Sequence, residues 1–280
     1  MMRAAKSSKV IQKILAFILI IAFIAFLLFP FYWMLVTSVK PNEELFTGIV
    51  TYWPKNFTAK AYENLFRSYD FLSPMLNSLF VSVITTIISL VVSVMAAFAF
   101  ARYEFPGRKL LMMLFLTNNM FPTVLLLISL FTIINRMGIL YTPWALIVSY
   151  SSFTIPFSLW LINGYMSDMP LEIEEAAMID GCNRGLAFIL VELPMLIPSI
   201  ISCGVYILMN AWNEYTFAVM FTNENNRTIS VALKNLVGQL GVQWDLMTAG
   251  GIIAVLPICI MFFFAQKRLV AGLTAGAVKG

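Results

Sequence analysis

The stretch EEAAMIDGCNRGLAFILVELP, residues 174–194, decides how this chain folds, because it places acids and glycines between long apolar runs. A helix is predicted from Pro170 to about residue 180, since proline suits the first turn of a helix and Asp168 is available as its N-cap. Gly181 supplies the permissive backbone that ends helices. The stretch therefore predicts a short, capped helix in a loop between two apolar segments.

The predicted helix combines an acidic start with a narrow apolar face. Its acids Glu172, Glu174 and Glu175 favour the positive end of the helix dipole. The apolar face consists of Leu171, Ala176 and Ile179, with Ala177 beside them. Two interpretations remain open: a well-capped surface helix between two spans, or a dock for a basic partner.

The composition is that of a membrane protein. Charged residues make up 11% of the chain, against about 25% in a typical soluble domain. Hydrophobic residues make up 60%, and the mean hydropathy is +0.86. A lipid-spanning helix needs about 20 apolar residues, and charge-free intervals of that length recur along the chain.

Six such intervals predict an all-α protein with six transmembrane helices. They are residues 14–39, 71–101, 110–135, 137–167, 193–213 and 246–266. The membrane domain is thus expected over residues 14–270, with an external loop at about 38–70 and a cytoplasmic loop at about 168–192.

The distribution of Lys and Arg predicts that both termini are cytoplasmic. Basic residues precede the first apolar run, so residues 1–13 form a cytoplasmic N-terminus ahead of an uncleaved first helix. By the same criterion, residues 271–280 form a cytoplasmic C-terminal tail.

The chain lacks the residues of the common enzymatic sites. It contains no histidine and no phosphate-binding G-x-x-x-x-G-K-[ST] motif, and its three cysteines show no metal-ligand spacing. No metal, cofactor or catalytic residue is therefore expected on this chain. A passive path driven by another protein fits these absences better than an enzyme.

Polar side chains at membrane depth are the candidates for such a path. They are Asn118, Asn119, Asn163, Asn210, Trp212, Asn213, Glu214 and Tyr215. An interfacial aromatic belt is the alternative for residues 212–215. A second polar set, Ser78, Ser82, Thr85, Ser89 and Ser93, shares one helical face and either lines the path or allows close helix packing.

The loop also resembles a known signature. Its order Glu175-Ala176-Ala177, Gly181, Val191, Leu193-Pro194 is similar to the EAA signature of permease subunits in bacterial ABC importers. The resemblance implies the type I importer permease fold. It further implies that the loop helix is a coupling helix that contacts an ATPase subunit through Glu174, Glu175, Ala176, Ala177, Asp180 and Gly181.

Three other stretches resemble the carbohydrate branch of these importers, especially the maltose type. They are NSLFVSVITTIISLVVSVMAAFAFARYEFPGRK, residues 77–109, NAWNEYTFAVMF, residues 210–221, and GLTAGAVKG, residues 272–280. The resemblance implies that the tail contacts the ATPase subunits through Gly272, Leu273, Thr274, Gly276 and Lys279.

By the same resemblance, the chain is expected to import a sugar or oligosaccharide across the bacterial cytoplasmic membrane. Its expected partners are a second, non-identical permease, two cytosolic ATPase subunits, an extracytoplasmic sugar-binding protein and membrane lipid, but no nucleic acid. ATP and magnesium would bind to the ATPase subunits. The alternatives are an ion-coupled secondary transporter, which would need an inverted repeat and a charged midplane site, and a non-transport scaffold.

Overall fold

The computed structural model describes residues 2–238 and 241–277. The chain divides into two compact units. The first unit comprises residues 1–70 and 235–255, and the second comprises residues 71–234 and 256–280.

The first unit is built on a long apolar helix and a structured loop. Helix α1 begins at Met2, so the predicted N-terminal segment before the first span is part of the same helix. The elements of this unit are α1 (Met2–Ser38), α2 (Asn42–Leu45), α3 (Lys60–Arg67), the strands β1 (Val237–Gly238) and β2 (Gly241–Val242), and the first part of α13 (Trp244–Ala277). The two strands pair antiparallel.

Glu44 organises the loop after α1. Its carboxylate accepts hydrogen bonds from Thr51 Oγ1 at 2.7 Å and from the backbone N–H of Lys55 at 3.1 Å. The Thr51 bond, with those from the backbone of Lys55 and Asn56 and the charge of Lys40, holds the pKa of Glu44 below its ordinary value of 4.5. Lys40, whose side chain is buried, donates to the Thr51 carbonyl.

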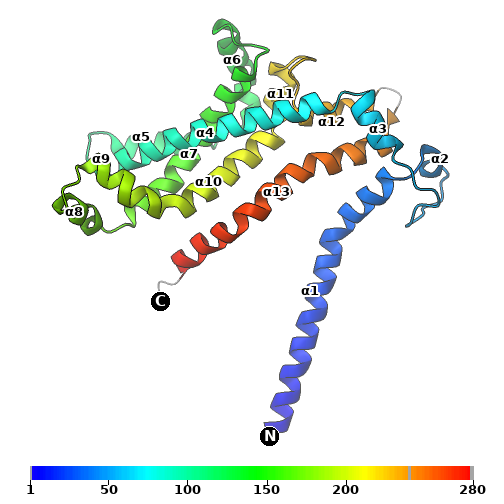
Figure 1. Cartoon of the computed structure of the whole chain (residues 1–280), viewed down its shortest axis with the longest axis horizontal. Helices are drawn as coiled ribbons and strands as arrows, with labels where there is room; N and C mark the ends of the chain where they lie inside the picture. The colour runs from blue at the N-terminus through cyan, green and yellow to red at the C-terminus, as the bar shows by residue number, and fades with distance from the viewer. Residues whose placement is uncertain (1, 239–240, 278–280) are drawn as a thin grey trace. The chain divides into compact units, whose positions relative to one another are not determined.

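The second unit is a bundle in which α4, α7 and α10 pack against one another (Figure 1). The α8 and α9 helices lie at one end of this bundle, and α11 and α12 lie at the other (Figure 1). The elements of this unit are α4 (Leu72–Arg102), α5 (Arg108–Asn118), α6 (Thr123–Arg136), α7 (Pro143–Ser167), α8 (Leu171–Ile179), α9 (Arg184–Ala187), the π-helix η1 (Phe188–Glu192), α10 (Leu193–Asn213), α11 (Thr216–Phe221) and α12 (Ile229–Asn235).

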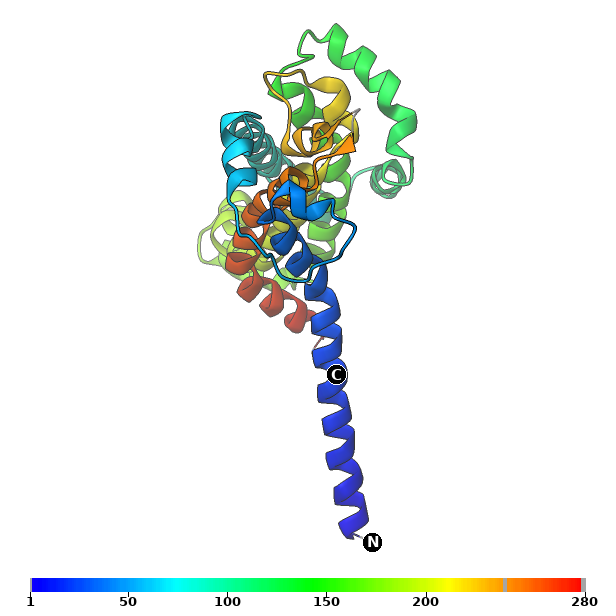
Figure 2. The same ribbon diagram turned by 90° about the vertical axis from the view of Figure 1, so that its right-hand side faces the viewer.

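The predicted all-helical membrane fold is confirmed, with one change in the third span. Five helical segments are long and apolar enough to cross a membrane, and the bent pair α5 and α6 can supply a sixth span. The two helices of the pair are bent by 101° relative to one another. The bend is visible in Figure 2, where α6 is green. The break falls just before α6, at Pro122, whose ring removes a backbone donor and disfavours helix at the preceding residue. By contrast, Pro156, Pro198 and Pro257 lie inside continuous helices.

The serine and threonine stripe of α4 serves helix packing. Its members Ser78, Ser82, Thr85, Ser89 and Ser93 are all buried. Ser89 Oγ lies 2.9 Å from Thr154 Oγ1 of α7, and Ser93 Oγ donates to the Ile155 carbonyl at 3.3 Å. Small polar side chains let two helices approach closely and bond across the interface, so the stripe joins α4 to α7 at Ser89 and Ser93.

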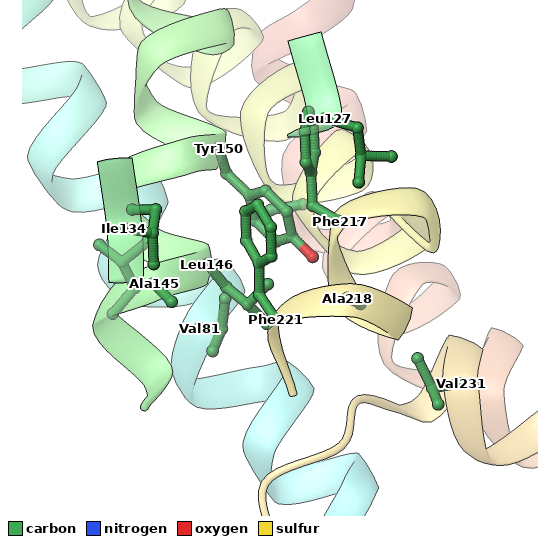
Figure 3. Packing of buried hydrophobic residues seen from close by; sticks show 12 residues of the cluster. Val81, Leu127, Ile134, Ala145, Leu146, Tyr150, Phe217, Ala218, Phe221 and Val231 are labelled. Carbon is green, nitrogen blue, oxygen red and sulfur yellow. The ribbon is translucent and has the colours of Figure 1, made fainter. Parts of the chain in front are cut away.

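An apolar core supports the end of the bundle that carries α11. Figure 3 shows the ring of Tyr150 beside Phe217, within a cluster that draws on α4, α6, α7, α10, α11 and α12. Phe217 stacks on Phe153 with the ring centroids 5.4 Å apart. This cluster fixes the short helix α11 against α7.

Candidate functional site

A polar cavity of about 230 Å³ lies in the second unit beside the break between α5 and α6. It brings together Asn118 and Asn119 at the end of α5, Asn210 of α10 and Glu214 after α10. The remaining lining residues are Phe121, Thr123, Tyr150, Phe153, Thr154, Tyr206, Ala211 and Phe217. Amides, a carboxylate and aromatic rings around one hollow are the groups that orient a small polar ligand.

Glu214 has a structural role at the edge of this cavity. It accepts a hydrogen bond from Tyr150 Oη at 2.8 Å and from the backbone N–H groups of Phe217 and Ala218 at 3.0 and 3.1 Å. The carboxylate therefore satisfies the first donors of α11, as an N-cap side chain does. Its role as a sugar ligand stays a prediction: a carboxylate can accept about four hydrogen bonds, and three donors contact this one.

The amides of the cavity are held by the backbone. Asn118 Nδ2 donates to the Ser152 carbonyl at 3.1 Å and so ties the end of α5 to α7. Asn210 Nδ2 donates to the Tyr206 carbonyl one turn earlier, at 2.8 Å. Asn210 lies in the last turn of α10, and Glu214 follows the end of that helix at Asn213.

Four predicted path residues lie elsewhere. Trp212 is buried with 3% of its surface exposed, and Tyr215 is exposed. Asn213 donates to the Met209 carbonyl at 2.9 Å. Within the described part of the chain, the buried Oδ1 of Asn163 has no hydrogen-bond partner. None of these four lines the polar cavity.

Sequence reasoning missed the aromatic lining of the cavity. Tyr150 and Tyr206 lie within continuous apolar runs, where tyrosine does not interrupt the hydrophobic pattern. The spacing of Tyr206 and Asn210, four residues apart on one helix, is the signal that could have placed Tyr206 there.

The loop at 168–192, here called the α8 loop, contains the predicted helix almost unchanged. Helix α8 runs over Leu171–Ile179, and Gly181 after it has a φ of +97°. Asp168 is not the cap of α8, because it lies at the C-terminal end of α7, and α8 has no side-chain cap bond. Asp168 is instead the C-cap residue of α7, and Pro170 occupies the N-cap position of α8.

The α8 loop divides its predicted coupling residues between two environments. Glu175, Ala176, Asp180 and Gly181 are exposed, whereas Glu174 and Ala177 are buried. Two large apolar side chains of α8 also face outward, with Leu171 54% and Ile179 86% exposed. A shallow hollow beside them is lined by Glu172, Ile173, Ala176, Ala177, Asp180 and Val191. Leu171 and Ile179 thus give α8 exposed apolar side chains, and the acids Glu175 and Asp180 are exposed on the same segment.

Glu174 points into a buried ion cluster. Its carboxylate lies 3.2 Å from Arg102 Nε and 2.7 Å from Arg184 Nε. Arg102 also donates from Nε to Glu192 Oε1 at 2.7 Å. The side chains of Arg102, Glu174 and Glu192 are at most 3% exposed, so Glu174 is turned away from any partner that covers α8.

The described part of the predicted tail belongs to the last helix, α13. Gly272, Leu273, Thr274 and Gly276 fall in the final turns of α13, which ends at Ala277. Lys279 lies outside the described residues.

No group of three or more acidic, cysteine or histidine side chains with the spacing of a metal site occurs among the described residues. Cys182, Cys203 and Cys259 are free thiols.

Comparison with known proteins assigns the chain. Residues 89–275 match the family described as binding-protein-dependent transport system inner membrane component. The chain belongs to this family. The permease is therefore a multi-pass inner-membrane protein and, as a transport component, is not itself an enzyme.

Relatives of the permease cover nearly its whole length. The inner membrane ABC transporter permease protein YcjP of Escherichia coli is 36% identical over 92% of this chain and 93% of its own. The trehalose transport system permease protein SugB of Mycobacterium tuberculosis is 34% identical over 92% and 94%. The trehalose/maltose transport system permease protein MalG of Thermococcus litoralis is 34% identical over 97% and 99%.

The fold of the permease is also that of a solved transporter. A chain of a bacterial ABC transporter involved in the import of the acidic polysaccharide alginate superposes with a TM-score of 0.81. The superposition covers 93% of this chain and 97% of the transporter chain, and the two sequences are 21% identical. The predicted ABC importer permease fold is thereby confirmed.

Proposed function

We propose that this permease forms half of the translocation path of an ATP-driven importer of sugars or oligosaccharides. The relatives named for trehalose and for maltose support the substrate class. The polar cavity supports it too, because amides and tyrosines surround the hollow beside the helix break. At about 230 Å³ it is smaller than the roughly 300–1,000 Å³ of typical ligand sites, which suits a path completed by a second, non-identical permease.

The observation that carries the proposal is the exposed surface of α8. Ile179 projects from it with 86% exposure beside the acids Glu175 and Asp180. In this proposal the α8 loop and both termini face the cytoplasm, and α8 fits a groove of an ATPase subunit that presents basic side chains. ATP and magnesium bind to two such subunits, and this chain binds no cofactor of its own.

Two further contacts complete the proposed assembly. An extracytoplasmic sugar-binding protein delivers the substrate, as the family description suggests for its transport systems. In this proposal the tail from Gly272 on contacts the ATPase subunits, and α13 carries the described part of it as far as Ala277. Deleting residues 272–280 removes no candidate span, since the last one ends at Gln266.

Affinity capture tests the assembly. The tagged permease, expressed with the neighbouring genes of its operon, should retain the second permease and the ATPase subunit. Ile179→Lys should release the ATPase subunit while the two permeases stay together, because lysine removes the apolar contact and is repelled by the basic groove. Retention of the ATPase by this variant at the wild-type ratio would show that α8 is not the docking surface.

A further inference from the structure

The buried ion cluster joins three elements that are far apart in sequence. Arg102 is the last residue of α4, Glu174 belongs to α8, and Glu192 ends the π-helix η1 that leads into α10. The guanidinium of Arg102 contacts both carboxylates. One side chain thus connects the α8 loop to two membrane helices at the same end of the bundle.

The geometry of the cluster allows Arg102 to hold α8 and η1 against the end of α4, an arrangement here called the clamp. Arg102 Nε donates to Glu192 at 2.7 Å and lies 3.2 Å from Glu174 Oε2, so the guanidinium hydrogen-bonds to one carboxylate and forms an ion pair with the other. Its partner in η1 lies in a π-helical turn, a rare geometry that frequently marks functional positions. Arg184 completes the charge balance, because it pairs with Glu174 and lies over the ring of Tyr103 with 5.3 Å between its Cζ and the ring centroid.

Because these side chains are buried, breaking the clamp is costly in free energy. Arg102, Glu174 and Glu192 are at most 3% exposed, whereas Arg184 is 43% exposed. A buried charge that loses its partner is strongly destabilised, since neither water nor another ion compensates it. If α8 moved away from α4, Glu174 would keep only its contact with the partly exposed Arg184, and the buried guanidinium of Arg102 would lose one of its two partners.

From the clamp, movement has a continuous route to the cavity. The end of α4 that carries Arg102 belongs to the same helix whose serine stripe bonds to α7 through Ser89 and Thr154. Thr154 itself lines the polar cavity, as does Tyr150 one turn earlier. If α8 moves while Arg102 holds it to α4, then α4 moves with α8. The bond between Ser89 and Thr154 carries this movement to α7.

We propose that Arg102 is a positioning residue for energy coupling: its guanidinium clamps α8 and η1 to the end of α4, so that these elements move as one body. The inference rests on the proposed function. It assigns to Glu174 the anchoring of the coupling helix, and leaves docking to the exposed residues of α8.

The test uses the complete transporter in proteoliposomes, with phosphate release and uptake of radiolabelled maltose and trehalose measured on the same sample. The variants are Arg102→Gln, and a neutral set that combines Arg102→Gln with Glu174→Gln and Glu192→Gln. Arg108→Gln, at the start of α5 and outside the cluster, is the matched control. The readout is sugar imported per ATP hydrolysed, since a loss of folded complex lowers both rates but not their ratio.

The ratio should fall about fivefold or more in Arg102→Gln and in the neutral set, the scale of a typical coupling energy between sites. It should stay at the wild-type value in Arg108→Gln. If Arg102→Gln does not assemble, the neutral set decides, because it leaves no unpaired buried charge. A wild-type ratio in the neutral set would overturn the clamp, whereas a wild-type complex without ATP-dependent uptake would overturn the proposed function instead.

Discussion

The hydroxyl of Tyr150 donates to Glu214 Oε2 at 2.8 Å and thereby joins the middle of α7 to the first turn of α11 at the edge of the polar cavity. The same carboxylate accepts from the backbone of Phe217 and Ala218. Glu214 is thus a cap that positions the cavity wall.

The cap predicts a graded response at Glu214. Glu214→Ala should lower the stability of the permease by about 0.5–2 kcal/mol, the usual loss for an N-cap side chain. Glu214→Gln retains an acceptor and should cost less. Thermal unfolding of the purified complex measures both, and Tyr150→Phe in the same background tests whether the two side chains are coupled. Equal stability of the alanine and wild-type complexes would contradict the cap.

Gly181 provides a test of the turn that ends α8. Its φ of +97° is a conformation that side-chain-bearing residues rarely adopt, and a Cβ added there meets nothing within 4 Å. Gly181→Val should therefore cost roughly 1–3 kcal/mol through backbone strain alone. Gly164→Ala, at a helical glycine that also has open space around it, is the control and should leave the melting temperature at or above the wild-type value. An unchanged melting temperature for Gly181→Val would show that the turn relaxes without strain.

Charge reversal on α8 should weaken docking of the ATPase. Glu175 is exposed on the helix, and lysine there would face the basic groove that we propose on the partner. Glu175→Lys should weaken binding of the ATPase subunit by about tenfold, equivalent to 1.4 kcal/mol. Glu224→Lys, an exposed acid in the loop after α11, is the matched control with no expected effect. Titration of the purified ATPase onto the immobilised permease pair measures the change, and equal affinities for the two variants would refute an electrostatic dock on α8.

The loop of the first unit should be sensitive to acid. The pKa of Glu44 is lowered from 4.5, chiefly by the hydrogen bond from Thr51. A carboxylate with a lowered folded pKa contributes stability above its unfolded pKa, and that contribution is lost as the pH falls through the folded value. Amide hydrogen exchange over residues 51–57 should match that of Glu44→Gln below this value and be slower than in the variant at neutral pH. Equal exchange in both proteins at neutral pH would mean that the carboxylate does not hold the loop.

Local features of the fold were predictable from the sequence because they depend on neighbouring residues. The limits of α8 follow from Pro170 and Gly181, and the spans follow from charge-free runs. An interruption of the third span at Pro122 was predictable from the proline, whereas the size of the bend between α5 and α6, 101°, was not. A proline can kink a helix slightly or break it, and its surroundings decide which.

The site was less predictable, since its contacts join distant residues. Arg102 and Glu192 are 90 residues apart, and Tyr150 and Glu214 are 64 apart. Nothing in a linear pattern reports such pairs. Glu174 was predicted as a coupling residue with the exposed acids of α8, but its side chain is buried against Arg102. Asn210 and Glu214 line the same cavity, although Glu214 follows the end of α10 rather than lying on the helix.

The most direct test of the account is sugar uptake by proteoliposomes that contain the permease with its proposed partners. Each component is omitted in turn: the second permease, the ATPase subunits, the binding protein and ATP. Uptake of maltose or trehalose should require all four, and the permease alone should hydrolyse no ATP. Uptake by the permease alone, driven by an ion gradient without ATP, would contradict the account and favour a secondary transporter.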